Sequence, residues 1–171
     1  MSDERTDLSH KQAAPRRVGF FTVTVSDTRT ADDDVSGACM RDLIAQAGHD
    51  SVAHCIVPDE PARVVEAIAA AVSRDDVQIV VLSGGTGLSS RDGTFEAVSA
   101  LLEKPMPGFG EIFRMLSFEQ VGAAAMLSRA TAGLYRGRAV FALPGSPKAV
   151  SLALSRLILP EAGHLVFESR R

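Results

Sequence analysis

The chain has 171 residues, and its 18 basic and 21 acidic side chains give a formal net charge of −3. This length suits one domain, and the slight acidic excess argues against a nucleic-acid partner, which would need a basic surface. Hydrophobic residues make up 46% of the chain and charged residues 23%, a composition that excludes wholesale disorder.

Residues 1–16 are polar, charged and aperiodic, and they predict a disordered tail ahead of one domain over residues 17–171. This tail lacks the apolar segment of a signal peptide. Apolar runs elsewhere are shorter than the ~20 residues of a membrane span, so we expect a cytoplasmic protein with no membrane partner. Cys39 and Cys55 lie among apolar neighbours and outside any CxxC pair, which predicts core thiols rather than a disulfide or a zinc site.

The rest of the chain alternates between strand and helix patterns. The predicted strands cover residues 18–25, 51–57, 77–83 and 132–142, the last range holding two strands joined by a turn. The predicted helices cover residues 36–48, 61–72, 94–102, 112–116, 122–126 and 149–159. This order predicts an α/β domain with a largely parallel sheet. Ligands of such sheets bind beyond the carboxyl ends of the strands, so the loops there are the candidates for chemistry.

A glycine-rich loop follows the uniformly apolar strand over residues 77–83. Its residues are Gly84, Gly85, Thr86 and Gly87, and Ser83 at the end of the strand is a candidate ligand beside them. Successive glycines let backbone N–H groups approach a bound anion, which makes this loop a candidate phosphate site. The lysine of a P-loop and the third small residue of a dinucleotide fingerprint are both missing. The alternative is a turn that uses glycine for geometry alone.

Carboxylates follow two of the predicted strands. Asp92 could bind Mg²⁺ beside the glycine loop, with Arg91 clamping a phosphate. Alternatively, Asp92 or Thr94 caps the next helix and Arg91 is solvated. Asp59 is a turn residue beside Pro61 or a second carboxylate of the same site. If Asp59 and Asp92 converge, the pair suits metal-assisted phosphoryl or nucleotidyl transfer.

Further polar residues stand at the other strand ends. Ser26 and Asp27 end the first strand and could line the same crevice, whereas the acidic run 32–34 is expected to be a solvated surface. Gly145, Ser146 and Lys148 form either a second anion site or a rigid turn. The four histidines belong to no catalytic pattern.

Several ordered motifs carry a resemblance across about residues 18–164. They are Val23–Asp27, Val57–Glu60, Ser83–Thr94, Pro107–Arg114, Leu127–Ala130 and Phe141–Lys148. Together these motifs resemble the MoaB/MogA family of molybdenum cofactor biosynthesis proteins, and more closely its MoaB branch. The resemblance implies a three-layer α/β/α fold around a mostly parallel sheet, and assembly into trimers or hexamers.

The resemblance also implies an activity. Active members use ATP and Mg²⁺ to attach AMP to the terminal phosphate of molybdopterin, with release of pyrophosphate. Asp59 and Asp92 match the family's two required carboxylates, which would act through Mg²⁺, and the backbone of residues 84–87 would hold a phosphate. Ser26 and Asp27 would line the nucleotide or pterin pocket, while Ser146 and Lys148 would lie near the pterin or the phosphates.

A second function is compatible with the same resemblance. The chain would then be a non-catalytic carrier that binds molybdopterin or a nucleotide and contacts other proteins of the pathway. Retention of Asp59 and Asp92 favours the enzyme, whereas the likeness to the MoaB branch favours the carrier. Binding of molybdopterin without ATP consumption separates the two.

Overall fold

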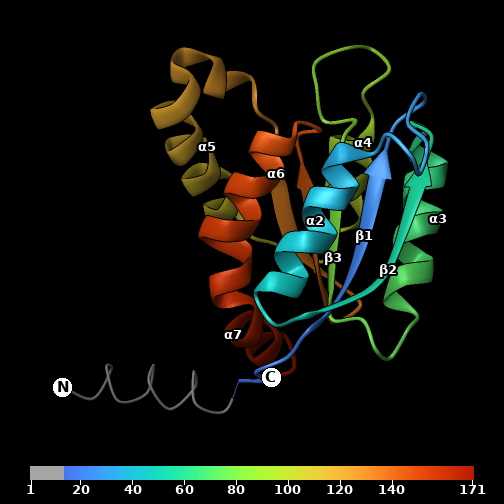
Figure 1. Ribbon diagram of the computed structural model, residues 1–171, viewed down its shortest axis with the longest axis vertical. Helices are drawn as coiled ribbons and strands as arrows, with labels where there is room; N and C mark the ends of the chain where they lie inside the picture. Colours follow the sequence, from blue (N-terminus) through green and yellow to red (C-terminus); the bar gives the residue numbers. More distant parts are fainter. Residues whose placement is uncertain (1–13) are drawn as a thin grey trace.

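The computed structural model describes residues 14–171, in which a six-stranded sheet has the order β2-β1-β3-β6-β5-β4 (Figure 1). The strands are β1 (Gly19–Val25), β2 (Asp50–Val57), β3 (Ile79–Ser83), β4 (Lys104–Pro105), β5 (Thr131–Tyr135) and β6 (Arg138–Leu143). Pairing is parallel from β2 through β1 and β3 to β6, and antiparallel from β6 to β5 and β4. The mostly parallel sheet is as predicted, and the short edge strand β4 was not predicted.

Helices cover both faces of the sheet. One layer contains α2 (Val35–Gln46), α5 (Pro107–Val121), α6 (Pro147–Ala153) and α7 (Leu159–Ser169), and the other contains α3 (Pro61–Val72) and α4 (Thr94–Leu101). Successive strand residues alternate between the layers, because side chains of a strand point to opposite faces. Ile79 and Val81 of β3 pack under the first layer, and Val80 and Leu82 under the second. The three-layer α/β/α architecture is confirmed.

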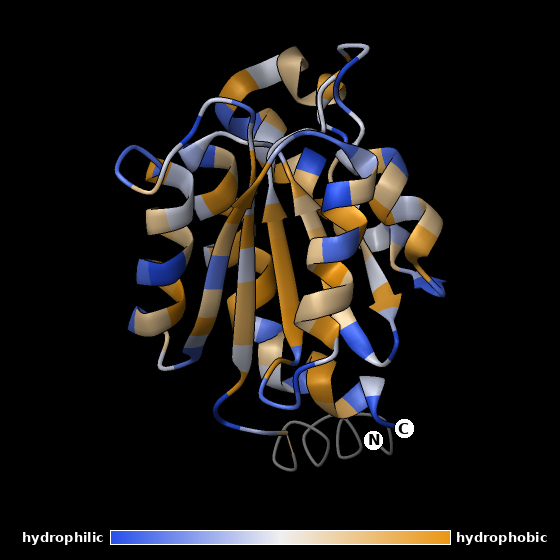
Figure 2. Ribbon diagram, turned by 90° about the vertical axis from the view of Figure 1, so that its right-hand side faces the viewer, coloured by the Kyte–Doolittle hydropathy of each residue, from blue (hydrophilic) through white to orange (hydrophobic). Residues whose placement is uncertain are grey.

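Apolar residues concentrate in the strands and on the inner helix faces, while polar residues gather in the loops (Figure 2). The strand order places β1 between β2 and β3, so the chain runs from β1 outward to β2 through α2 and then crosses back over β1 to β3 through α3. Such a reversal opens a crevice at the carboxyl ends of the strands. The loops after β1, β2, β3 and β6 therefore meet at one edge of the sheet, where the candidate site lies.

Two predicted helix boundaries are wrong, and proline explains both. Helix α5 starts at Pro107 rather than at residue 112, because proline suits the first helical turn, where its missing N–H is not needed. The last helix was predicted to stop at residue 159. It continues instead through a π-helical turn, η2 (Leu154–Ile158), into α7, where Pro160 again occupies the first turn.

The small-residue segment 122–126 was predicted to be helical. In the structure it belongs to a 3₁₀ helix, η1 (Gly122–Leu127). Of the six residues of this helix, all of which the structure describes, only Ala125 is buried. Met126 is 78% exposed and Leu127 54%. Packing within the chain therefore does not cover this segment.

Most of the predicted tail, residues 1–13, lies outside the described residues. Its last part lies against α7, where Ala14 and Pro15 pack close to Gly163. The continuous helical segment over 147–169 is long and apolar enough to cross a membrane by length and composition. Its residues Val150, Leu154 and Ile158, however, are buried in the core layer against the sheet. Cys39 and Cys55 are half-buried free thiols.

Candidate active site at the carboxyl edge of the sheet

The loop after β2 places the Asp59 carboxylate against the glycine-rich loop. A Cβ atom on Gly85 would lie 2.6 Å from Oδ1 of Asp59 and would also collide with the hydroxyl of Thr94. Gly85 has a positive φ of 64°, so glycine is required here for both space and backbone conformation. The Asp59 N–H donates to Oδ1 of Asp27 at 3.1 Å, which ties the loops after β1 and β2 together.

Asp92 lies on the other side of the same loop. A Cβ atom on Gly87 would lie 2.6 Å from Oδ2 of Asp92, and this oxygen accepts a hydrogen bond from the Ser89 N–H at 3.0 Å. Helix α4 has Gly93 as its N-cap with no side-chain cap bond, so the alternative that Asp92 or Thr94 caps this helix is wrong. Both carboxylates therefore converge on residues 85–87.

The negative charge of the Asp59 carboxylate is only partly compensated by its neighbours. Burial raises the pKa of Asp59, and the charges of Asp92 and Asp27 raise it further, while a hydrogen bond from the Gly93 N–H opposes them. Within residues 14–171, no group of three or more His, Cys, Asp or Glu side chains could hold a metal ion. Two converging carboxylates nevertheless fit Mg²⁺, which commonly takes one or two protein carboxylates together with waters and substrate phosphates.

The raised pKa predicts a stability effect of Asp59→Asn in the metal-free protein. Because the folded-state pKa lies above the unfolded one, ionisation of Asp59 destabilises the fold fully above the folded pKa, and the cost disappears as pH falls below about 4. Asn keeps the shape without the charge. We therefore expect Asp59→Asn to melt at a higher temperature than the wild type at about pH 7, with the gap closing toward about pH 4.

Thermal unfolding with a chelator at several pH values measures this gap. The exposed Asp75, in the turn between α3 and β3, provides the matched control, since Asp75→Asn removes one charge far from the site. If Asp59→Asn is less stable than the wild type at neutral pH, the prediction is wrong. The contacts of the ionised Asp59 carboxylate would then stabilise the fold by more than its burial and its charged neighbours cost.

The glycine loop presents its N–H groups as a phosphate site would need. Gly84 and Gly85 both have positive φ, of 109° and 64°, which turns successive peptides sharply. The Gly84 N–H donates to the Leu143 carbonyl, but those of Thr86, Gly87 and Leu88 meet no acceptor within the described chain. Thr94 Oγ1 is buried beside them and also has no hydrogen-bond partner. These unpaired donors need an acceptor, which an oxygen atom of a bound phosphate would supply.

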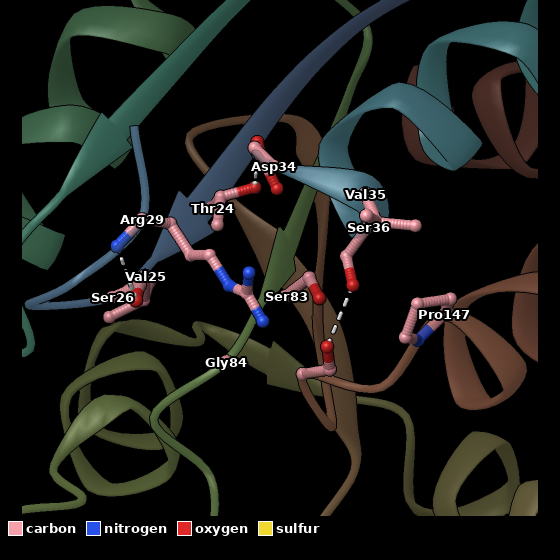
Figure 3. A pocket seen from close by; sticks show the side chains of 11 residues that line it. Thr24, Val25, Ser26, Arg29, Asp34, Val35, Ser36, Ser83, Gly84 and Pro147 are labelled. Atoms are coloured by element: carbon pink, nitrogen blue, oxygen red, sulfur yellow. Dashed lines mark hydrogen bonds between the residues drawn. The ribbon is translucent and has the colours of Figure 1, made fainter. Parts of the chain in front are cut away.

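A polar pocket of about 170 Å³ lies between the loops after β1, β3 and β6 (Figure 3). Four predicted site residues contribute to its wall, together with unpredicted ones. The predicted residues are Ser26, Ser83, Gly84 and Gly145, and the unpredicted ones include Arg29, Asp34 and Ser36. Ser36 donates to the Gly145 carbonyl at 2.7 Å, which joins the start of α2 to the loop after β6.

Asp34 forms the buried base of this pocket. It is the N-cap of α2, which begins one residue before the predicted start at residue 36, and it accepts a hydrogen bond from the Gly37 N–H at 2.8 Å. Thr24 donates to its Oδ2 at 2.8 Å, and Nε2 of His54 lies 2.9 Å from the same atom. Asp34 is only 5% exposed, so the prediction of a solvated acidic run is wrong for this residue, although Asp32 and Asp33 are exposed.

His54 connects Asp34 to the sheet. A carboxylate only accepts, so Nε2 of His54 donates to Asp34, and Nδ1 lies 2.9 Å from the Thr22 hydroxyl. Burial lowers the pKa of His54, which favours the neutral ring that accepts from Thr22 at Nδ1. Neither residue stands in a catalytic motif of the sequence, and the only signal for Asp34 was its place just before a helix.

Arg91 borders the carboxylates, whereas Ser146 and Lys148 lie at another pocket. Arg91 is largely exposed and pairs with Asp27 at 2.8 Å. Ser146 is the N-cap of α6, and with Lys148 it lines a second pocket of about 180 Å³ between α5, η1 and α6. The loop after β6 thus contributes to two separate pockets. Arg129 was also not predicted as a site residue, and its side chain contacts the glycine loop.

Comparison with known proteins places this geometry in a family. A family described as a probable molybdopterin binding domain matches residues 21–164. The chain belongs to the MoaB/MogA family of molybdenum cofactor biosynthesis proteins. A relative from Bacillus anthracis, molybdenum cofactor biosynthesis protein B, is 48% identical over 163 residues, covering 95% of this chain and 96% of its own.

Solved structures of this MoaB/MogA family share the fold. A crystal structure of a molybdenum cofactor biosynthesis protein B has a TM-score of 0.90 at 48% identity and covers 92% of this chain and 99% of its own. The tungsten cofactor synthesizing protein MoaB from Pyrococcus furiosus has a TM-score of 0.83 at 37% identity, covering 92% of this chain and 100% of its own. The resemblance that the sequence motifs carried is confirmed.

Proposed function

We propose that this protein is a molybdopterin adenylyltransferase of molybdenum cofactor biosynthesis, acting in the cytoplasm. It would transfer AMP from ATP to the terminal phosphate of molybdopterin and release pyrophosphate. The observation that carries this proposal is the convergence of Asp59 and Asp92 on a glycine loop, next to N–H groups of residues 86–88 that meet no acceptor among the described residues. Such a site combines anion-binding donors with carboxylates suited to Mg²⁺, which is what transfer between two phosphorylated molecules requires.

The chemistry needs no protein nucleophile. An oxygen of the pterin's terminal phosphate forms a bond to the α-phosphorus of ATP, and the bond from that phosphorus to the pyrophosphate oxygen breaks. Catalysis then consists of positioning and charge neutralisation. Asp59 and Asp92 would hold Mg²⁺, which supplies positive charge to the phosphate oxygens when bound. The N–H groups of residues 86–88 would orient a phosphate, and the pocket at Asp34 would receive a ring of either substrate.

Turnover by the wild type tests this proposal. Purified protein is incubated with molybdopterin, ATP and Mg²⁺, and pyrophosphate is measured with each component omitted in turn. We expect release only when all three are present. Binding of molybdopterin with no pyrophosphate would instead support the non-catalytic carrier, in which the two carboxylates serve ligand binding alone.

We further propose that the chain forms a homo-oligomer, a trimer or a hexamer, through an apolar face of α5 and η1. Exposed large apolar side chains recur at three-residue spacing, which places them on one side of the helix. They are Ile112, Met115, Phe118 and Val121, followed by Met126 and Leu127 of η1. Contiguous exposed apolar surface of this kind is typical of protein–protein contacts.

Sedimentation of the purified chain and of Phe118→Asp tests the assembly. Phe118 is 61% exposed, so a charge there should leave the fold intact but place an unpaired carboxylate in the subunit contact. We expect the wild type to sediment as a trimer or hexamer and Phe118→Asp as smaller species. Ser73→Asp, which adds the same charge at the end of α3 on the opposite layer, should sediment like the wild type. A monomeric wild type would contradict the proposal.

A further inference from the structure

In three successive peptides of the glycine loop, the carbonyls of residues 85–87 are bound by the protein, whereas the N–H groups of residues 86–88 have no partner within residues 14–171. The Gly85 carbonyl accepts from the Thr94 N–H at 2.9 Å. The next two carbonyls, of Thr86 and Gly87, both accept from the guanidinium of Arg129, the first from Nε at 3.0 Å. The N–H groups on the other sides of these peptides belong to Thr86, Gly87 and Leu88, which meet no acceptor within residues 14–171.

Peptide planarity links these two observations. In a trans peptide the C=O of one residue and the N–H of the next point in opposite directions, and rotation about the bond between them is blocked. Holding the Thr86 carbonyl therefore directs the Gly87 N–H away from Arg129, and holding the Gly87 carbonyl directs the Leu88 N–H likewise. One side chain thus sets the direction of two of the three unpaired donors.

Arg129 is itself held in place from α4. Its guanidinium forms an ion pair with Glu96 and lies 5.0 Å from the ring centre of Phe95, both in the first turn of that helix. Nη2 also lies 3.5 Å from the Asp92 carbonyl. The side chain is only 22% exposed, although it comes from the loop between η1 and β5, 37 residues from Asp92 in sequence. This planar group with five donors suits several acceptors at fixed angles, which the single ammonium of lysine cannot match.

We propose that Arg129 is a positioning residue that turns the peptides of residues 86–88 so that their N–H groups bind the phosphate of the substrates. The inference rests on the proposed function only in that the loop takes a phosphate. Arg129 does not touch the reacting atoms, since its donors are directed to the loop carbonyls and to Glu96. Its effect is to fix the anion site before a ligand arrives, which reduces the ordering cost of binding.

The test compares Arg129→Gln and Arg129→Lys with the wild type in two measurements that need no turnover. The first is amide hydrogen exchange over residues 84–92, and the second is calorimetric binding of inorganic pyrophosphate with Mg²⁺. We expect faster exchange in this segment in both variants, and about tenfold weaker binding in Arg129→Gln. Arg129→Lys keeps the charge but not the planar donors, so it should recover only part of the affinity.

Two controls separate positioning from a general loss of structure. Arg63→Gln removes an exposed arginine that pairs with Glu66 on α3, and it should change neither measurement. Exchange in the buried strands β1 and β3 should stay at the wild-type rate in every variant. Unchanged loop exchange and unchanged pyrophosphate affinity in Arg129→Gln would overturn this inference. A wild type that binds pyrophosphate and never releases it from ATP would overturn the proposed transferase alone.

Discussion

Replacing Asp92 with Asn should lower turnover by at least about a hundredfold, because a group that neutralises charge at a transferring phosphate is typically worth that much. Asn has nearly the same shape, and its side-chain oxygen can still accept from the Ser89 N–H, which donates to Asp92 at 3.0 Å. The loop should therefore keep its conformation while the metal site loses one of its two carboxylates. Steady-state pyrophosphate release at saturating Mg²⁺ measures the effect.

The control for this substitution is Asp75→Asn, which removes a charge from an exposed turn far from the site. It should turn over at the wild-type rate, and both variants should melt within a few degrees of the wild type. Wild-type turnover by a folded Asp92→Asn protein would remove Asp92 from the reaction and leave its contact with Gly87 as a packing feature.

Asp34→Ala should destabilise the protein by about 3 kcal/mol, because it deletes a helix cap and leaves two buried donors unpaired. The helix-cap hydrogen bond comes from the Gly37 N–H. The two donors left unpaired are the Thr24 hydroxyl and the His54 ring N–H. Thr24 is 4% exposed, Gly37 is buried and the His54 side chain is 16% exposed, so water cannot readily replace the carboxylate. Denaturant unfolding monitored by circular dichroism gives the free energy of unfolding.

Asp32→Ala is the matched comparison, since Asp32 belongs to the same acidic run but is exposed. We expect it to change the free energy of unfolding by less than about 0.5 kcal/mol. Equal effects of the two substitutions would mean that the hydrogen bonds of Asp34 contribute nothing beyond those of a surface carboxylate.

The fold could be predicted from the sequence because its signals are local. The uniformly apolar run of β3 predicts a strand covered on both faces, and the alternation with helical patterns predicts parallel pairing. The predicted helix boundaries were wrong where proline can either end a helix or stand in its first turn. Pro107 and Pro160 were both interpreted as breaks, but each lies in the first turn of a helix, where proline is tolerated.

The candidate site was only partly predictable, because its contacts join residues far apart in sequence. Asp59 and Asp92 stood out since each follows a strand, and parallel strands bring such loops to one edge. Arg129 follows no strand and comes from the loop between η1 and β5, so no local pattern links it to the glycine loop. Asp34 was hidden in an acidic run, whose usual place is the surface, and only the packing of α2 on β1 and β2 shows that it is buried.

The transfer of AMP to molybdopterin is tested by following the transferred group itself. ATP labelled at the α-phosphate is incubated with molybdopterin, Mg²⁺ and the wild-type protein, and the products are separated and identified by mass. We expect the label in an adenylylated pterin, with unlabelled pyrophosphate released in equal amount. Label that remains in ATP, under conditions where molybdopterin is bound, would contradict the proposed transfer.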